Sequence, residues 1–172
     1  MLPPQRRPGK FFSVAELQRL LVCEQVAAVC YRMGAEGVAL LLVQTRKGRR
    51  WTFPKGCTEP GLSHAEAAAL EAFEEAGVHG RMEESAFARY TCTKRSNARR
   101  FGSFEITVSV HLCEVTRLRA PQEANRNPRW FSPEETKARL QKGRLPQEAA
   151  SLARVVDRAV ARIRKSRFTS LA

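Results

Sequence analysis

Residues 56–78 read GCTEPGLSHAEAAALEAFEEAGV and contain the clearest local signals in the chain. The segment from Lys55 to Leu62 has two Gly and one Pro, so it is predicted to be a loop. Ser63 followed by Glu66 forms a capping-box pattern, which predicts a helix that begins after Ser63. Gly77 is a typical C-terminal stop. The stretch therefore predicts a loop followed by a well-bounded helix.

The predicted helix carries three carboxylates at Glu71, Glu74 and Glu75. Their i, i+3 and i+4 spacing places all three on one side of the helix. Hard oxygen ligands without a neighbouring His or Cys favour magnesium, with manganese as the alternative, over zinc. A divalent ion held there would polarise a phosphoanhydride and activate a water molecule. The alternative interpretation is a solvent-facing side of an ordinary surface helix.

The same stretch resembles the Nudix box, G-x5-E-x7-R-E-U-x-E-E-x-G-U, in which U is a bulky aliphatic residue. Gly56 opens the pattern, Glu71 matches its second Glu, and Glu74 and Glu75 match its Glu pair. Gly77 and Val78 close it without a gap. The resemblance implies a pyrophosphohydrolase that depends on magnesium. It also implies that Glu71 and Glu75 bind the metal, and that the Gly56 region offers a carbonyl oxygen.

Three positions depart from the box. Leu62 stands where the pattern has its first Glu, Leu70 stands where it has Arg, and Ala72 replaces a larger aliphatic residue. In the family the Arg helps to orient the neighbouring Glu, so another group must hold Glu71 or the site is looser. Leu62 removes one candidate general base. Glu74 and Glu75 are therefore the predicted catalytic residues, with Glu74 acting as a ligand or as the base that activates water.

The resemblance covers roughly residues 24–165 and implies the α/β Nudix fold, a mixed β-sheet between helices (α/β/α). We expect one domain over residues 1–172, with mobile ends. The residue patterns predict strands at 25–32, 37–45, 49–53, 87–93, 103–115 and 129–131. They predict helices beginning at Ser13 and Ser132 and a terminal helix over residues 146–164.

The charge balance favours an anionic substrate. Thirty Lys and Arg oppose seventeen Asp and Glu, which gives a formal net charge of +13. The basic segments look most like the Nudix branch that hydrolyses diphosphoinositol polyphosphates and dinucleoside polyphosphates. The candidate substrate-binding residues are Arg46, Arg50, Lys55, Lys94, Arg95, Arg99, Arg100 and Arg144. For each of them, placement on a solvated surface is the alternative.

Two rival functions use the same charge. One is a nucleic-acid-binding module with a weakened active site, and the other is an enzyme that acts on capped or triphosphorylated RNA 5′ ends. The basic clusters lack the interleaved aromatic residues of single-strand platforms, so nucleic acid is not the favoured partner. Trp51 and Trp130 are expected in the core rather than on a nucleobase. Glu123 is a further candidate metal ligand, and the three histidines are read as structural.

The cellular setting is expected to be the cytoplasm. No apolar run approaches the ~20 residues of a membrane span, and no apolar segment follows the basic amino terminus. A membrane partner is therefore not expected, and the oligomeric state stays open. The five cysteines form no C-x-x-C pair and are expected to be reduced thiols.

Overall fold

The computed structural model describes residues 24–95 and 103–170. The sheet contains β1 (Gln25–Gly34), β2 (Gly37–Gln44), β3 (Trp51–Thr52), β4 (Lys55–Cys57), β5 (Val78–Met82), β6 (Ala88–Arg95), β7 (Ser103–Leu118) and β8 (Arg129–Phe131). The helical segments are α2 (His64–Ala76), η1 (Ala124–Arg126), α3 (Pro133–Gln141) and α4 (Pro146–Ser170). The helix expected from Ser13 lies outside the described residues.

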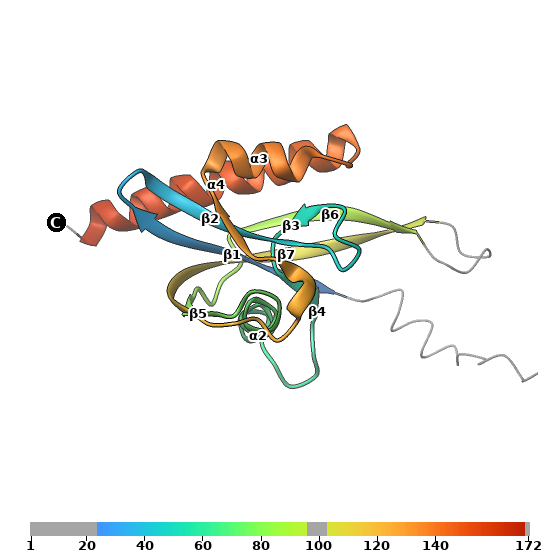
Figure 1. The fold of residues 1–172 in the computed structure, drawn as a ribbon, viewed down its shortest axis with the longest axis horizontal. Helices are drawn as coiled ribbons and strands as arrows, with labels where there is room; N and C mark the ends of the chain where they lie inside the picture. Colours follow the sequence, from blue (N-terminus) through green and yellow to red (C-terminus); the bar gives the residue numbers. More distant parts are fainter. Residues whose placement is uncertain (1–23, 96–102, 171–172) are drawn as a thin grey trace, which may run out of the picture.

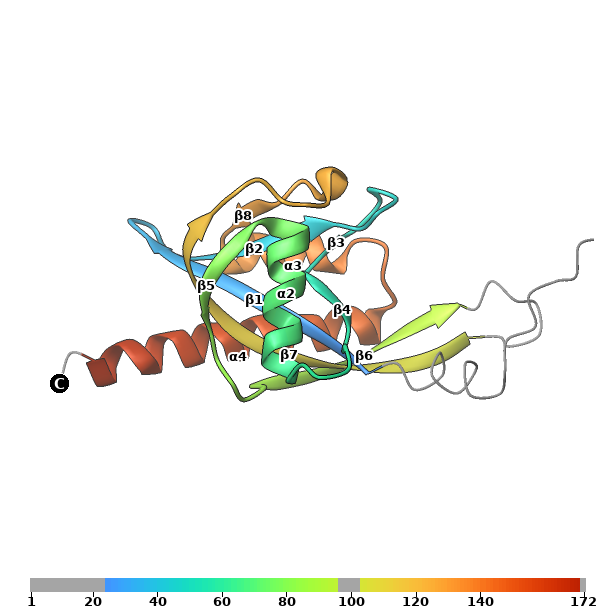
Figure 2. The same ribbon diagram turned by 90° about the horizontal axis from the view of Figure 1, so that it is seen from below.

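The sheet lies between two helical layers, as predicted (Figure 1). Helix α2 covers one face, and α3 and α4 cover the other, which Figure 2 shows from the side of α2. The sheet is mixed because β1 runs parallel to β7, whereas its pairings with β2 and β4 are antiparallel. The main strand order is β3-β2-β1-β7-β5. The α/β/α arrangement expected from the resemblance is therefore confirmed.

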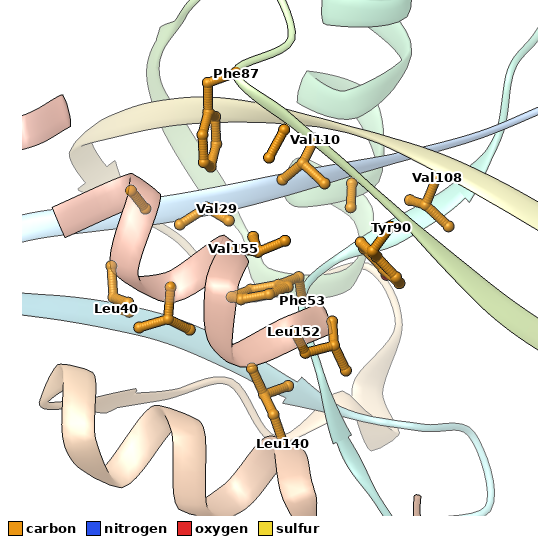
Figure 3. Close-up of a cluster of buried hydrophobic side chains, with 14 of the residues drawn as sticks. Val29, Leu40, Phe53, Phe87, Tyr90, Val108, Val110, Leu140, Leu152 and Val155 are labelled. Carbon is orange, nitrogen blue, oxygen red and sulfur yellow. The ribbon is translucent and has the colours of Figure 1, made fainter. Parts of the chain in front are cut away.

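Strand β1 is apolar on both faces because both faces are covered. Val26, Ala28 and Cys30 point towards α2, whereas Ala27 and Val29 belong to the larger core on the side of α3 and α4. Figure 3 shows this larger core, where Phe53 lies among strand residues and the side chains of α3 and α4. The central strands are thus fixed from both sides, and they hold α2 in a defined position.

Helix α2 follows the predicted boundaries. Ser63 accepts a hydrogen bond from the Glu66 backbone at 3.2 Å, and the Glu66 carboxylate accepts one from the Ser63 backbone at 2.7 Å. Gly77 ends the helix with a φ of 67°, a conformation that favours glycine. A Cβ at Gly77 would also overlap the Arg119 carbonyl. Small alanines allow the helix to approach the sheet closely, and the buried ones are Ala65, Ala67, Ala68, Ala72 and Ala76.

One prediction of local structure was wrong, and one strand was missed. The segment from Lys55 was expected to be only loop, but its first three residues form β4 against β1, with Ala27 opposite Lys55. Strand β5 was not predicted, because its sequence VHGRM lacks a clear alternation and its pairing with β7 is irregular between His79 and Gly80. Short strands that depend on partners distant in the sequence give little local signal.

The terminal helix extends further than predicted, to Ser170 rather than residue 164. Within residues 24–95 and 103–170, no helix is both long and apolar enough to cross a membrane. Cys30, Cys92 and Cys113 are buried free thiols, as expected. Cys57 is disulfide-bonded, so the expectation of a reduced thiol was wrong at that position.

Candidate active site

Glu75 is the most enclosed carboxylate of α2, with only 3% of its surface exposed. One carboxylate oxygen, Oε2, accepts the Lys55 backbone N–H from β4 at 3.3 Å. The other, Oε1, accepts a short hydrogen bond from the Arg126 guanidinium. Since both oxygens have protein donors, the side chain is fixed between α2, β4 and η1.

Glu71 lies against the start of the box. A Cβ placed on Gly56 would overlap the Glu71 carboxylate, so this carboxylate occupies the space that only a glycine leaves open. Helix α2 packs directly against β4, and the two elements bring Glu71 beside the Gly56 backbone. That Gly56 and Glu71 both bind a metal stays a prediction.

Arg126 joins three segments of the chain at this point. Its guanidinium donates to Glu75, to Glu123 Oε2 at 2.5 Å and to the Gln44 carbonyl at 3.2 Å. Glu123 also accepts a hydrogen bond from Arg46 at 3.2 Å, and its backbone N–H donates to the Glu74 carbonyl at 3.0 Å. The loop before β8 is thereby tied to the carboxyl end of α2.

The three glutamates therefore differ in their surroundings. Glu75 faces Arg126 and β4, Glu71 faces Gly56, and Glu74 is half-buried, with its backbone carbonyl tied to Glu123. Within the described ranges, no group of three or more His, Cys, Asp or Glu side chains is already gathered as a metal site. The carboxylate oxygens of Glu71, which lies directly against Gly56, and of Glu75 nevertheless suit a hard divalent cation.

The charges in this cluster act on one another. Burial raises the pKa of Glu75 to about 7, while Arg126 and the Lys55 N–H oppose the rise. Burial and then the nearby Glu74 and Glu123 raise the pKa of Glu71. The hydrogen bond from Arg126 lowers the pKa of Glu123. Negative charge at Glu71 and Glu75 is therefore less favourable than in water, even with Arg126 nearby, and a bound divalent cation would stabilise it.

The metal-free protein is expected to lose stability as the pH rises from about 5 to about 8. The pKa of Glu75 is about 7 in the folded chain against an ordinary value of 4.5, so between these values the folded state holds more protons than the unfolded state. The free energy of unfolding therefore falls with increasing pH, by up to about 3 kcal/mol for a shift of this size. Denaturant titrations in chelator across this range measure the slope.

Glu75→Gln is the matched variant for this measurement, because it removes the titrating proton and keeps the size of the side chain. We expect a clearly shallower pH dependence in the variant. An identical slope in the two proteins would contradict the assignment of this titration to Glu75.

Three predicted substrate-binding residues line one cavity on the α4 side of the sheet. This inner cavity has a volume of about 220 Å³, and its lining includes the cations Arg50, Lys55 and Arg144. Arg144 is nearly enclosed and donates to the Trp51 and Leu140 carbonyls at 2.8 and 2.6 Å. Glu148 also lines the cavity, and this acidic neighbour was not predicted. Lys55 links the cavity to Glu75 through its backbone.

A second, more open space adjoins the inner cavity. This basic hollow has a volume of about 520 Å³ and is lined by Thr45, Arg46, Lys47, Arg49, Arg50 and Gly143. Arg50 lines both spaces, and Arg46 reaches Glu123 in the carboxylate cluster. Lys94 and Arg95 lie at the end of β6, and Arg99 and Arg100 lie outside the described residues. The structure thus groups Arg50, Lys55 and Arg144 around one cavity, and it connects Lys55 to Glu75 and Arg46 to Glu123 by hydrogen bonds.

Arg126 was missed from sequence. It lies 51 positions after Glu75, in a short loop segment without a repeated pattern. The available signal was Leu70, because a missing arginine in the box leaves a need for another cation. Trp51 packs on the larger core with its ring edge-on to Phe131 at 5.1 Å, and Trp130 packs on the core below α2. The expected core placement of both tryptophans is therefore confirmed.

Comparisons with known proteins show which family this chain resembles. The model of the NUDIX domain family matches residues 24–154. "Nudix hydrolase 4" of Arabidopsis thaliana is 36% identical over 101 residues, 58% of this chain and 46% of that protein. "Diphosphoinositol polyphosphate phosphohydrolase 3-beta" of Bos taurus is 39% identical over 59 residues, 34% of this chain and 36% of that protein. The matched regions thus span less than half the length of these curated relatives.

A solved structure extends the comparison to the whole fold. A binary complex of a C. elegans Ap4A hydrolase has a TM-score of 0.60 over 84% of this chain and 99% of that chain. Its sequence identity is 19%, so this likeness shows the shared fold alone.

Proposed function

Since the chain belongs to the NUDIX domain family, we propose that it is a magnesium-dependent pyrophosphohydrolase that cleaves a phosphoanhydride bond in a densely anionic small molecule. The observation that carries this proposal is the hydrogen bond that joins the buried Glu75 to the backbone of Lys55, a cation that lines the inner cavity. Diphosphoinositol polyphosphates and dinucleoside polyphosphates are the proposed substrate classes. Proteins named for such substrates are among the relatives and the solved structures with the same fold.

Glu71 and Glu75 would hold the divalent ion, with the Gly56 carbonyl as a further oxygen donor. A bound magnesium or manganese ion supplies charge neutralisation and a water molecule of lowered pKa. Glu74 is proposed to accept a proton from the attacking water or to act as an additional ligand. Lys55 keeps Glu75 in place through its backbone N–H at 3.3 Å.

The cations around the inner cavity and the basic hollow would bind the phosphates that do not react. Arg50 lies where the two spaces meet, and Arg46 leads from the basic hollow to the carboxylate cluster. Guanidinium groups bind phosphate through charge-assisted, often bidentate, hydrogen bonds. Binding energy from these phosphates would position the scissile bond against the carboxylates.

A phosphate-release screen tests the proposal. The compounds are a diphosphoinositol polyphosphate, a dinucleoside polyphosphate, a nucleoside triphosphate, a nucleotide sugar and 5′-triphosphorylated RNA, each with and without magnesium. Turnover of one of the first two classes that requires magnesium is expected. Preferred release of pyrophosphate from RNA would favour the rival RNA-end function. Salt-dependent oligonucleotide binding without turnover of any compound would favour a binding module.

Arg50→Met is expected to raise KM for the preferred polyphosphate about tenfold, with a smaller change in kcat. The loss of one charge-assisted phosphate contact corresponds to roughly 1.4 kcal/mol of binding free energy. Steady-state kinetics measure both constants. Arg158→Met is the matched control, because it removes an exposed cation of α4 that lines neither space. Equal changes in both variants would show a general charge effect and would contradict a local contact at Arg50.

A further inference from the structure

The box has no arginine at position 70, yet the most buried carboxylate of α2, Glu75, is hydrogen-bonded to an arginine. Leu70 occupies the arginine position of the pattern, and Arg126 approaches Glu75 from η1, 51 positions further along the chain. Arg126 is 8% exposed and Glu75 is 3% exposed, so the pair is shielded from water. This contact comes from an element outside the box.

We propose that Arg126, an arginine from outside the box, is the positioning residue that holds Glu75 in the orientation in which it binds the divalent ion. This inference rests on the proposed function, because it assumes that Glu75 is a metal ligand. It goes further by assigning to Arg126 a role that acts through Glu75.

The geometry of Arg126 supports a fixed brace rather than a mobile counter-ion. Three guanidinium nitrogens each have a different acceptor, namely Glu75, Glu123 Oε2 at 2.5 Å and the Gln44 carbonyl at 3.2 Å. These acceptors belong to α2, the loop before η1 and the end of β2. Because each of the three nitrogens of this planar group donates to a different acceptor, the guanidinium has one orientation. The orientation of the Glu75 carboxylate is restricted by its hydrogen bond to this group.

Lys55 completes the orientation of Glu75 from the opposite side. Its backbone N–H donates to Oε2, while Arg126 donates to Oε1. The carboxylate plane is therefore set by two donors on separate elements. Each oxygen keeps a second lone pair, so a cation beside Gly56 can be bound while the brace stays in place.

Manganese titrations without substrate test the role of Arg126. Isothermal titration calorimetry compares the wild type with Arg126→Met, Glu75→Gln and the double variant. Loss of an outer partner of a metal ligand commonly weakens metal affinity ~10–100-fold, so we expect Arg126→Met to bind Mn²⁺ at least ~10-fold more weakly. In the Glu75→Gln background, Arg126→Met is expected to cause no further weakening.

The direction of the change in Mn²⁺ affinity distinguishes a positioning role of Arg126 from a direct effect of its charge. Removing a positive charge beside a cation site would by itself strengthen Mn²⁺ binding. Unchanged or tighter binding by Arg126→Met overturns the inference, as does a full additional loss in the double variant. Unchanged binding by Glu75→Gln overturns the proposed metal site, and the inference with it.

Two further variants keep the test decisive. Arg81→Met is the matched control, because it removes an exposed ion pair with Glu114 and the same charge; it should leave Mn²⁺ affinity within about twofold of the wild type. An equal loss there would overturn a local role. If circular dichroism shows that Arg126→Met is unfolded, Arg126→Gln replaces it in the same comparison, because its amide nitrogen can still donate to Glu123 where Arg126 Nε does.

Discussion

Glu75→Gln is expected to lower turnover of the preferred substrate at least ~10²-fold. The substitution removes the negative charge that would hold the divalent ion, and with it much of the stabilisation of the transferring phosphoryl group. It also places an amide between two donors, because Glu75 accepts from both the Lys55 N–H and Arg126. One of these donors would then face the NH₂ group of the glutamine.

Measurements of kcat and of magnesium dependence check this expectation. The magnesium concentration for half-maximal activity should rise together with the loss of kcat. Glu84→Gln is a suitable control, because it changes an exposed carboxylate in the loop after β5. A Glu75→Gln enzyme with the turnover of the wild type would remove the carboxylate cluster from the proposed reaction.

The elements that sequence predicted well are those with local signals. Both ends of α2 were predicted correctly, the first from the capping box at Ser63 and Glu66 and the second from Gly77. The strand predicted at residues 37–45 is β2, and its Leu40 and Leu41 belong to the cores on opposite faces of the sheet. Such signals act over a few residues, so they do not depend on the rest of the fold.

The features that sequence did not predict depend on long-range partners. Strand β4 exists because Gly56 pairs with Val26, and β5 exists because it pairs with β7 across an irregular register. Arg126 reaches Glu75 only because the fold packs η1 against α2 and β2, and neither its neighbours nor its spacing distinguish it from other arginines. The spacing of the three glutamates gave their common helix side, but not the different partners that Glu71 and Glu75 have in the folded chain.

Gly56→Ala is expected to lower turnover about 10²-fold while the protein stays folded. The added Cβ would overlap the Glu71 carboxylate, which is the far end of a flexible side chain and can move away. The substitution would therefore displace the Glu71 carboxylate and leave the backbone in place. A displacement of about 1 Å in a reacting constellation can cost on the order of 10²-fold in rate. Kinetics and thermal unfolding of the same preparation measure both quantities.

Two other glycines make the comparison specific. Gly34→Ala should leave both rate and stability near the wild type, because the nearest atom to its added Cβ is the Gly37 carbonyl oxygen at 3.9 Å. Gly77→Ala should instead destabilise the fold, because φ is 67° and the new Cβ would meet the rigid Arg119 carbonyl. Two outcomes would contradict this role of Gly56. One is a Gly56→Ala protein that is destabilised as much as Gly77→Ala, and the other is a Gly56→Ala enzyme that is as active as Gly34→Ala.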